Sequence, residues 1–182
     1  MTSSVISDHY QPWLSAQGHS GYAWSILGAA TQATERIPLI TYVTRPIRRY
    51  HPAIGAQKAP TMQILSDGRF RLGLEAGENL NEHVVGKGWP AVGRRHEMRP
   101  KAVDIIAAMF DRDGSVNYHG KYFDIESALL WDRPDARVRS ATTPIATPPC
   151  SAQTGSSAGS GWARRSTRTC RDRRRWRPPR TS

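Results

Sequence analysis

The composition of the chain changes near Arg137, and this change limits what the chain can fold into more than any other feature. The 46 residues from Arg137 onward contain Val138 and Ile145 as their only aliphatic β-branched residues, and they contain no Leu, Met or Phe. Such a segment cannot bury enough apolar surface to offset about 1–2 kcal/mol of backbone entropy per residue. We therefore predict one folded domain over residues 1–136 and a disordered tail over residues 137–182.

The same boundary divides the charge. Residues 1–136 carry 15 Lys and Arg against 14 Asp and Glu, whereas residues 137–182 carry eleven arginines, no lysine and a single acidic residue, Asp172. Such a tail is typical of a GC-rich gene translated out of frame. The alternative is a basic arm that binds nucleic acid or another polyanion. We favour the basic arm less, because Trp162 and Trp176 are the only aromatic residues of the tail and no RGG or RS repeat occurs in it.

Several classes of protein are disfavoured by the rest of the composition. The sequence has no apolar run of eighteen residues and no signal peptide, so we expect a cytoplasmic protein without a membrane span. Cys150 and Cys170 both lie in the tail, too few for a disulfide framework or a zinc site. The six histidines show no HExxH spacing, and we predict no metal site.

Residues 1–136 alternate between strand-like and helix-like patterns. We predict strands over residues 5–7, 37–44 and 69–76, helices over residues 22–33, 53–65 and 101–110, and a hairpin over residues 115–125. Pro60 lies inside the second helix and would cost about 3 kcal/mol if that helix is straight. This order of elements is typical of an α/β protein with a parallel sheet or a (β/α) barrel.

In a (β/α) barrel the chemistry lies where strands end, so the residues that follow each predicted strand are the first candidates. Asp8 and His9 follow the first strand, and Trp13 lies nearby. An imidazole can accept or donate a proton near neutral pH, and an adjacent carboxylate can fix its tautomer. The competing interpretation is a capping aspartate and a core tryptophan.

Two further strand ends carry polar residues. Residues 41–52 include the end of the second strand and a following segment punctuated by Pro46 and Pro52, which is favoured as a surface loop. After the third strand comes Glu78, a candidate general acid. Asn79 and Glu82 have the spacing of a helix capping box, which is a structural alternative for this segment.

Three strings, taken in this order and spacing, resemble the luciferase-like (bacterial luciferase) superfamily. They are Ser-Asp-His-Tyr-Gln-Pro-Trp, Arg-Tyr-His-Pro-Ala and Gly-Glu-Asn-Leu-Asn-Glu. Within the superfamily they are most similar to the branch of F420-dependent glucose-6-phosphate dehydrogenase, over about residues 5–135. The resemblance implies a (β/α)8 TIM barrel, usually a homodimer, that transfers hydride between coenzyme F420 (alternatively FMN) and a small molecule such as a sugar phosphate.

The resemblance also implies roles for individual residues. His9 would be the base beside the reactive carbon, Glu78 the partner acid, and Trp13 a substrate contact. The positions that match cofactor contacts in the family are Asp8, Tyr42, Val43, Thr44 and Asn81. In this family the strand end at residues 42–44 often backs the cofactor ring through a non-prolyl cis peptide.

The sequence also departs from the family pattern. Relatives usually have a βα unit before the Ser-Asp-His strand, and a glycine-rich phosphate segment after the region that ends near Asp135. Arg45 stands where relatives have a small or uncharged residue, and Glu75 stands where glycine is usual. We therefore expect a partial barrel of about three β/α units, truncated at both ends, that is inactive or impaired as an oxidoreductase.

Overall fold

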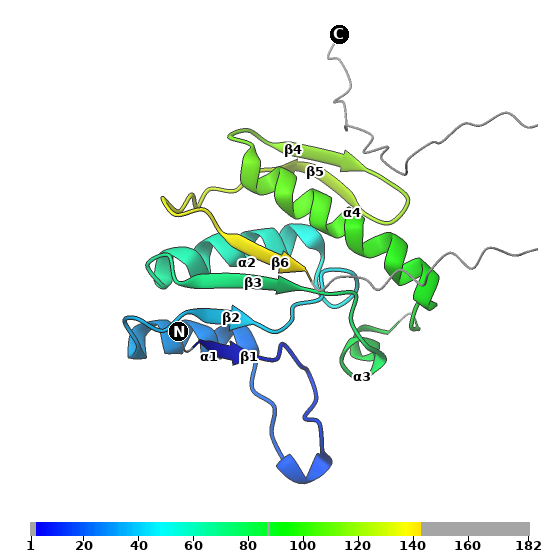
Figure 1. Cartoon of the computed structure of the whole chain (residues 1–182). Helices are drawn as coiled ribbons and strands as arrows, with labels where there is room; N and C mark the ends of the chain where they lie inside the picture. Colours follow the sequence, from blue (N-terminus) through cyan, green and yellow to red (C-terminus); the bar gives the residue numbers. More distant parts are fainter. Residues whose placement is uncertain (1–2, 87, 143–182) are drawn as a thin grey trace, which may run out of the picture. The chain divides into compact units, whose positions relative to one another are not determined.

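Four parallel strands form the sheet at the centre of the fold (Figure 1). The structure is a computed structural model that describes residues 3–86 and 88–142. In the sheet the strands lie in the order β1, β2, β3 and β6, with bounds Ser4–Ile6, Leu39–Thr41, Phe70–Leu74 and Arg139–Thr142. Every neighbouring pair in this sheet is parallel, so the carboxyl ends of the strands meet at one end of the sheet.

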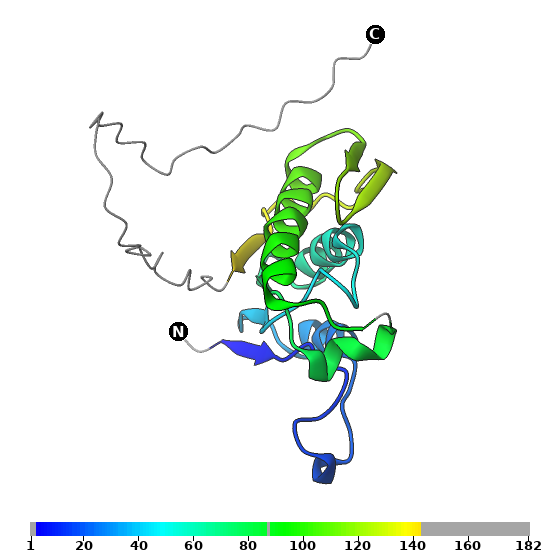
Figure 2. The same cartoon turned by 90° about the vertical axis from the view of Figure 1, so that its right-hand side faces the viewer.

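Helices α1 (Ala23–Ala33) and α2 (Pro52–Leu65) pack against this sheet, α1 on β2 and α2 on β3. Figure 2 shows both helices on the same side of the strands. Along β3 the side chains buried in the core are Phe70, Leu72 and Leu74, whereas Arg71 is exposed. Phe70, Arg71 and Leu72 follow the period of two of a β-strand, and Gly73 departs from it because it is also buried.

Helix α4 (Val92–Asp111) packs against α2 and begins well before residue 101, where the sequence predicted its start. Its buried apolar side chains recur at helical spacing: Met98, Ala102, Ile105, Ile106 and Met109. The prediction was wrong at the amino-terminal end, where residues 92–100 contain few apolar side chains. Both α4 and α2 continue through an internal proline, Pro100 and Pro60, because packing maintains the helix where local propensity disfavours it.

The predicted hairpin is confirmed. Strands β4 (Val116–His119) and β5 (Asp124–Ala128) pair antiparallel and form a separate two-stranded sheet. The backbone N–H of Gly120 donates to the carbonyl of Phe123 and closes the turn. Two short helices complete the order, α3 (Asn79–Glu82) and the 3₁₀ helix His83–Val85, and another 3₁₀ helix, Ser15–Gln17, lies in the loop after β1.

Strand β2 is shorter than predicted, and strand β6 was not predicted. Strand β2 ends at Thr41, and a cis peptide joins Tyr42 to Val43. Pairing resumes as an isolated bridge between Thr44 and Leu74. Strand β6 lies in the predicted tail, so the expectation of disorder was wrong for residues 139–142. These residues pair with β3, which supplies backbone hydrogen bonds that need no apolar side chains. The rest of the predicted tail, residues 143–182, lies outside the described residues.

The described part of the chain has neither a membrane-spanning helix nor a metal-binding cluster. Within residues 3–86 and 88–142, no helix is long and apolar enough to cross a membrane. The same residues contain no group of three or more His, Cys, Asp or Glu side chains that could hold a metal ion. Cys150 and Cys170 lie outside this range.

Candidate active site

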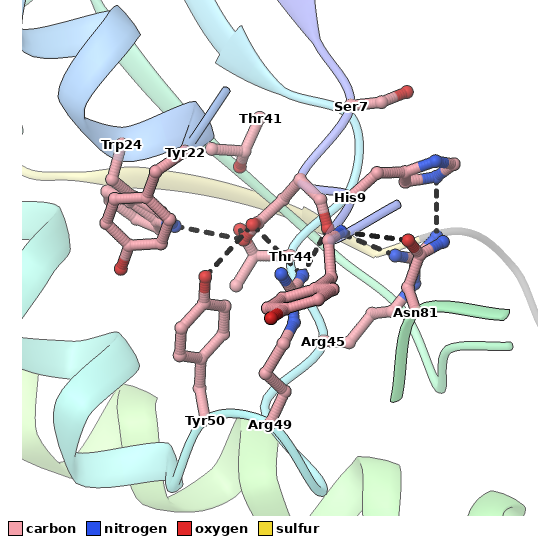
Figure 3. A network of polar contacts seen from close by, with 12 residues as sticks. Ser7, His9, Tyr22, Trp24, Thr41, Thr44, Arg45, Arg49, Tyr50 and Asn81 are labelled. Carbon is pink, nitrogen blue, oxygen red and sulfur yellow. Dashed lines mark hydrogen bonds and ion pairs between the residues drawn. The ribbon is translucent and has the colours of Figure 1, made fainter. Parts of the chain in front are cut away.

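The segments that follow β1, β2 and β3 converge at the carboxyl end of the sheet (Figure 3). The first brings Asp8 and His9, the second brings residues 42–50, and the third brings Glu78 and Asn81. The predicted base and its partner acid are in contact, since His9 Nε2 lies 3.3 Å from Glu78 Oε1. Residues far apart in the chain thus meet where a parallel sheet of this kind places its chemistry.

Arg45 lies between the two members of this pair. Its Nη2 lies 3.0 Å from Glu78 Oε1 and 3.2 Å from His9 Nε2. Its Nη1 donates to the carbonyl of Asp8 at 3.2 Å. The side chains of Arg45 and His9 are buried, whereas that of Glu78 is 38% exposed. The cluster is therefore closed on the protein side and open to solvent at the carboxylate.

Asp8 is completely buried, and its carboxylate connects three segments of the fold. Oδ2 accepts from Trp24 Nε1 at 2.9 Å and from Thr44 Oγ1 at 2.8 Å. Oδ1 accepts from Tyr50 OH at 3.0 Å and from Arg49 Nη2 at 3.1 Å. Four donors leave this carboxylate no free edge, so its geometry is that of an anchor for the residue beside it, His9.

Asn81 and Glu82 hold neighbouring segments in place. Asn81 is buried; its Oδ1 accepts from the backbone N–H of Tyr10 at 2.8 Å and of Gln11 at 3.1 Å, and its Nδ2 donates to Glu78 Oε1 at 3.0 Å. Glu82 accepts from the backbone N–H of Arg49 at 2.9 Å.

The capping-box interpretation of this segment is therefore wrong. Glu78, and not Asn79, precedes the first turn of α3, and no side chain caps that helix. The carboxylate of Glu82 turns instead toward Arg49, with Glu82 Oε1 lying 3.4 Å from Arg49 Nε. Glu82 is completely buried, and a buried carboxylate requires a charged partner such as the guanidinium of Arg49.

Aromatic side chains lie on the open side of the cluster. The rings of His9 and Trp13 are in tilted contact, with their centroids 4.6 Å apart, and Trp13 is 60% exposed. Tyr42 is 64% exposed and begins the Tyr42–Val43 cis peptide, at the position where the family resemblance implied such a bond. Val43 and Thr44 are buried behind it.

Several residues of the site carried no clear signal in the sequence. The segment after β2 was interpreted as a surface loop, but Arg45 and Tyr50 are buried in it. Arg49 and Tyr50 belong to the Arg-Tyr-His-Pro-Ala string, which was a signal of family and not of contact. Trp24 was predicted only as part of the helix over residues 22–33.

Burial lowers the pKa of His9 below its ordinary value, and Arg45 lowers it further; Glu78 acts in the opposite sense. Burial also lowers the pKa of His51 and raises the pKa of Glu82. Near neutral pH the imidazole of His9 is therefore neutral, and it is available as a proton acceptor.

These shifts predict how stability depends on pH. In the unfolded chain His9 and His51 bind protons near the ordinary pKa of 6.5, whereas in the folded chain they bind protons only at lower pH. Stability should therefore be full above about pH 6.5 and should fall as the pH drops toward the folded-state values. The urea midpoint, measured from about pH 8 to about pH 5, checks this expectation.

The pKa of Glu82 shifts in the opposite direction and also affects the stability at these pH values. The contribution of His9 to the pH dependence of stability is therefore measured by comparing the wild type with a variant that lacks this histidine. His9→Gln should flatten the midpoint–pH curve in this range, whereas His119→Gln, at an exposed position of the hairpin, should leave it unchanged. Equal curves for the wild type and His9→Gln would contradict the assignment of a lowered pKa to His9.

Comparison with known proteins identifies the family of the chain. The family model described as luciferase-like monooxygenase matches residues 2–161. The chain belongs to this family. Its members among the solved structures are luciferase-like barrels, and the described residues form part of such a barrel. The predictions of the family and of a partial α/β barrel are confirmed.

The most informative relatives are named as F420-dependent enzymes. The chain is 39% identical over 136 residues to a protein of Beutenbergia cavernae named F420-dependent glucose-6-phosphate dehydrogenase, covering 75% of this chain and 40% of the relative. It also matches the structure of an F420-dependent secondary alcohol dehydrogenase in complex with an F420-acetone adduct, at 36% identity and a TM-score of 0.74, covering 77% of this chain and 42% of that one.

A more distantly related structure resembles the chain in its fold alone. The coenzyme F420-dependent tetrahydromethanopterin reductase from Methanopyrus kandleri has a TM-score of 0.58 at 21% identity. The chain spans about 40% of the length of the curated relatives it matches.

Proposed function

We propose that the chain carries the proton-transfer half of an F420-dependent oxidoreductase site. The observation that carries the proposal is the contact of 3.3 Å between His9 Nε2 and Glu78 Oε1 at the carboxyl end of a parallel sheet. The names of the relatives, a glucose-6-phosphate and a secondary alcohol dehydrogenase, support a substrate with a hydroxyl group, such as a sugar phosphate.

The residues present fit a planar deazaflavin. A ring that exchanges hydride requires an aromatic surface and an acid–base pair within reach of one another. The exposed rings of Trp13 and Tyr42 supply the surface, and the buried imidazole of His9 beside the half-buried Glu78 supplies the pair. When bound, F420 would accept the hydride from the carbon that bears the substrate hydroxyl.

The protein residues then account for the proton. The lone pair of His9 Nε2 takes the proton of the substrate hydroxyl, and Glu78 stabilises the imidazolium that forms. Trp13, in contact with the ring of His9, holds the substrate against it. We assign Asp8 and Asn81 positioning roles, because hydrogen bonds within the protein occupy their polar atoms. Tyr42, Val43 and Thr44 are proposed to support the cofactor ring.

Titration of the purified chain with F420, followed by the fluorescence of the deazaflavin, tests the proposal. We expect saturable binding that weakens about tenfold or more in Trp13→Ala, because an aromatic surface is lost. Trp131→Ala is the matched control, since Trp131 is 86% exposed and belongs to no part of the site, and it should bind as the wild type does. Absence of any change in fluorescence would refute the proposal.

The same titration with FMN distinguishes the alternative cofactor. Tighter binding of FMN than of F420 would favour a flavin enzyme over a deazaflavin enzyme. We propose that the turnover of a sugar phosphate by this chain is impaired, because the guanidinium of Arg45 contacts both His9 and Glu78.

A second candidate function, the binding of a polyanion, depends on the basic residues after Arg137 and not on the His9–Glu78 site. The eleven arginines of residues 137–182 are suited to a polyanion. A gel shift that weakens with salt and disappears when these residues are removed would favour it over a tail without function.

A further inference from the structure

Arg45 contacts both members of the proton-transfer pair, and this contact constrains where the proton of His9 resides. The guanidinium reaches the cluster from the segment after β2, where its side chain is 5% exposed (Figure 3). Its Nη2 lies within hydrogen-bond distance of two acceptor candidates, Glu78 Oε1 at 3.0 Å and His9 Nε2 at 3.2 Å.

The chemistry of the guanidinium decides the direction of both bonds. A guanidinium only donates, and each terminal nitrogen carries two hydrogens. One hydrogen of Nη2 can therefore point to the carboxylate of Glu78 and the other to the imidazole of His9. In the second bond Nε2 must be the acceptor, so it carries no proton, and the proton of the neutral ring is on Nδ1.

We propose that Arg45 is a positioning residue that holds His9 as the neutral, Nδ1-protonated imidazole and occupies the lone pair of Nε2 until a substrate hydroxyl replaces the guanidinium. In this arrangement Nη2 of Arg45 donates to both His9 Nε2 and Glu78 Oε1, and His9 and Glu78 form no hydrogen bond with each other. The resting site is thus masked at the atom that accepts the proton.

The surroundings of His9 agree with a neutral ring. The charged groups that face it are Arg45 and Arg49 from the segment after β2, Glu78 from the segment before α3, and its neighbour Asp8. An imidazolium here would place a third cation beside two arginines, both of them largely buried. Burial further disfavours the charged form.

The proposal depends on the proposed function only for the role of Nε2 as proton acceptor. The tautomer itself follows from the contact with Arg45. The decisive experiment therefore uses the full chain without cofactor, so that a failure to bind F420 leaves the tautomer assignment intact, and a wrong tautomer leaves F420 binding intact.

Nitrogen-15 NMR of the histidine-labelled chain tests the tautomer directly, with the His9 signals assigned by their loss in His9→Gln. We expect one protonated nitrogen, Nδ1, and an unprotonated Nε2 at neutral pH. A proton on Nε2 in the wild type would overturn the proposal.

Variants of Arg45 distinguish the effect of its contact with His9 from the effect of its charge on the tautomer of His9. In Arg45→Ala the proton should move to Nε2, which is then free to donate to Glu78, and the pKa of His9 should rise. Arg45→Lys, which keeps a cationic donor, should retain part of the Nδ1 tautomer. An unchanged tautomer in a folded Arg45→Ala protein would contradict the proposal.

Arg48→Ala is the matched control. Arg48 lies on the same segment, but its Nη2 donates to the carbonyls of Gly86 and Gly88 and does not contact His9. Removal of this charge should leave the tautomer of His9 as it is in the wild type. An equal response to Arg48→Ala and Arg45→Ala would show that net charge, and not the contact, sets the tautomer.

Discussion

Asp8→Asn is expected to lower the free energy of unfolding by about 3–5 kcal/mol, one of the two largest effects we predict. The carboxylate accepts from four donors, and an asparagine can offer only one acceptor oxygen, so its amide N–H₂ must face two of these donors. The substitution also leaves the buried guanidinium of Arg49 without its partner. Urea unfolding at neutral pH measures the change.

A surface aspartate provides the control for this substitution. Asp124→Asn removes the same charge from an exposed side chain that lies 3.6 Å from His119, and it should leave stability almost unchanged. Thr44→Val, a milder variant, removes one of the four donors and should cost about 1 kcal/mol. If Asp8→Asn and Asp124→Asn have equal effects, the carboxylate of Asp8 does not anchor the site.

Gly73→Ala is expected to destabilise the sheet by about 3 kcal/mol, because its central position in β3 has no room for a methyl group. A Cβ atom at Gly73 would lie 2.1 Å from the carbonyl oxygen of Thr41 and 3.2 Å from Val43 Cγ1. The first of these is a backbone atom, so β2 and β3 must separate locally. Urea unfolding measures the loss of stability, and F420 titration should show weaker binding, since the displaced segment leads into Tyr42.

Gly28→Ala is the matched control. Gly28 lies in α1, and no atom of a packed neighbour lies within 4 Å of the position that a methyl group would take, so alanine meets no obstacle there. Its higher helix propensity should stabilise the protein by about 1 kcal/mol. Equal stability of Gly73→Ala and the wild type would mean that the two strands tolerate a wider separation than their hydrogen bonds indicate.

Local signals predicted much of the fold and the central pair of the site. The alternation of strand and helix patterns indicated the order of elements, because each pattern lies within about a dozen neighbouring residues. His9 and Glu78 could be named in advance because each follows a strand, and the ends of parallel strands meet. The start of α4 was missed, because packing on α2 maintains the helix through Pro100 against its local propensity.

The sequence alone determined that this chain forms part of a β/α barrel of the luciferase-like family, with an imidazole and a carboxylate at the ends of its strands. Only the tertiary structure decided that Asp8 is an anchor, that Arg45 stands between His9 and Glu78, and that residues 139–142 extend the sheet. The physical reason is distance along the chain. Arg45 meets partners 36 and 33 residues away, and such contacts depend on how whole segments pack and not on any local pattern.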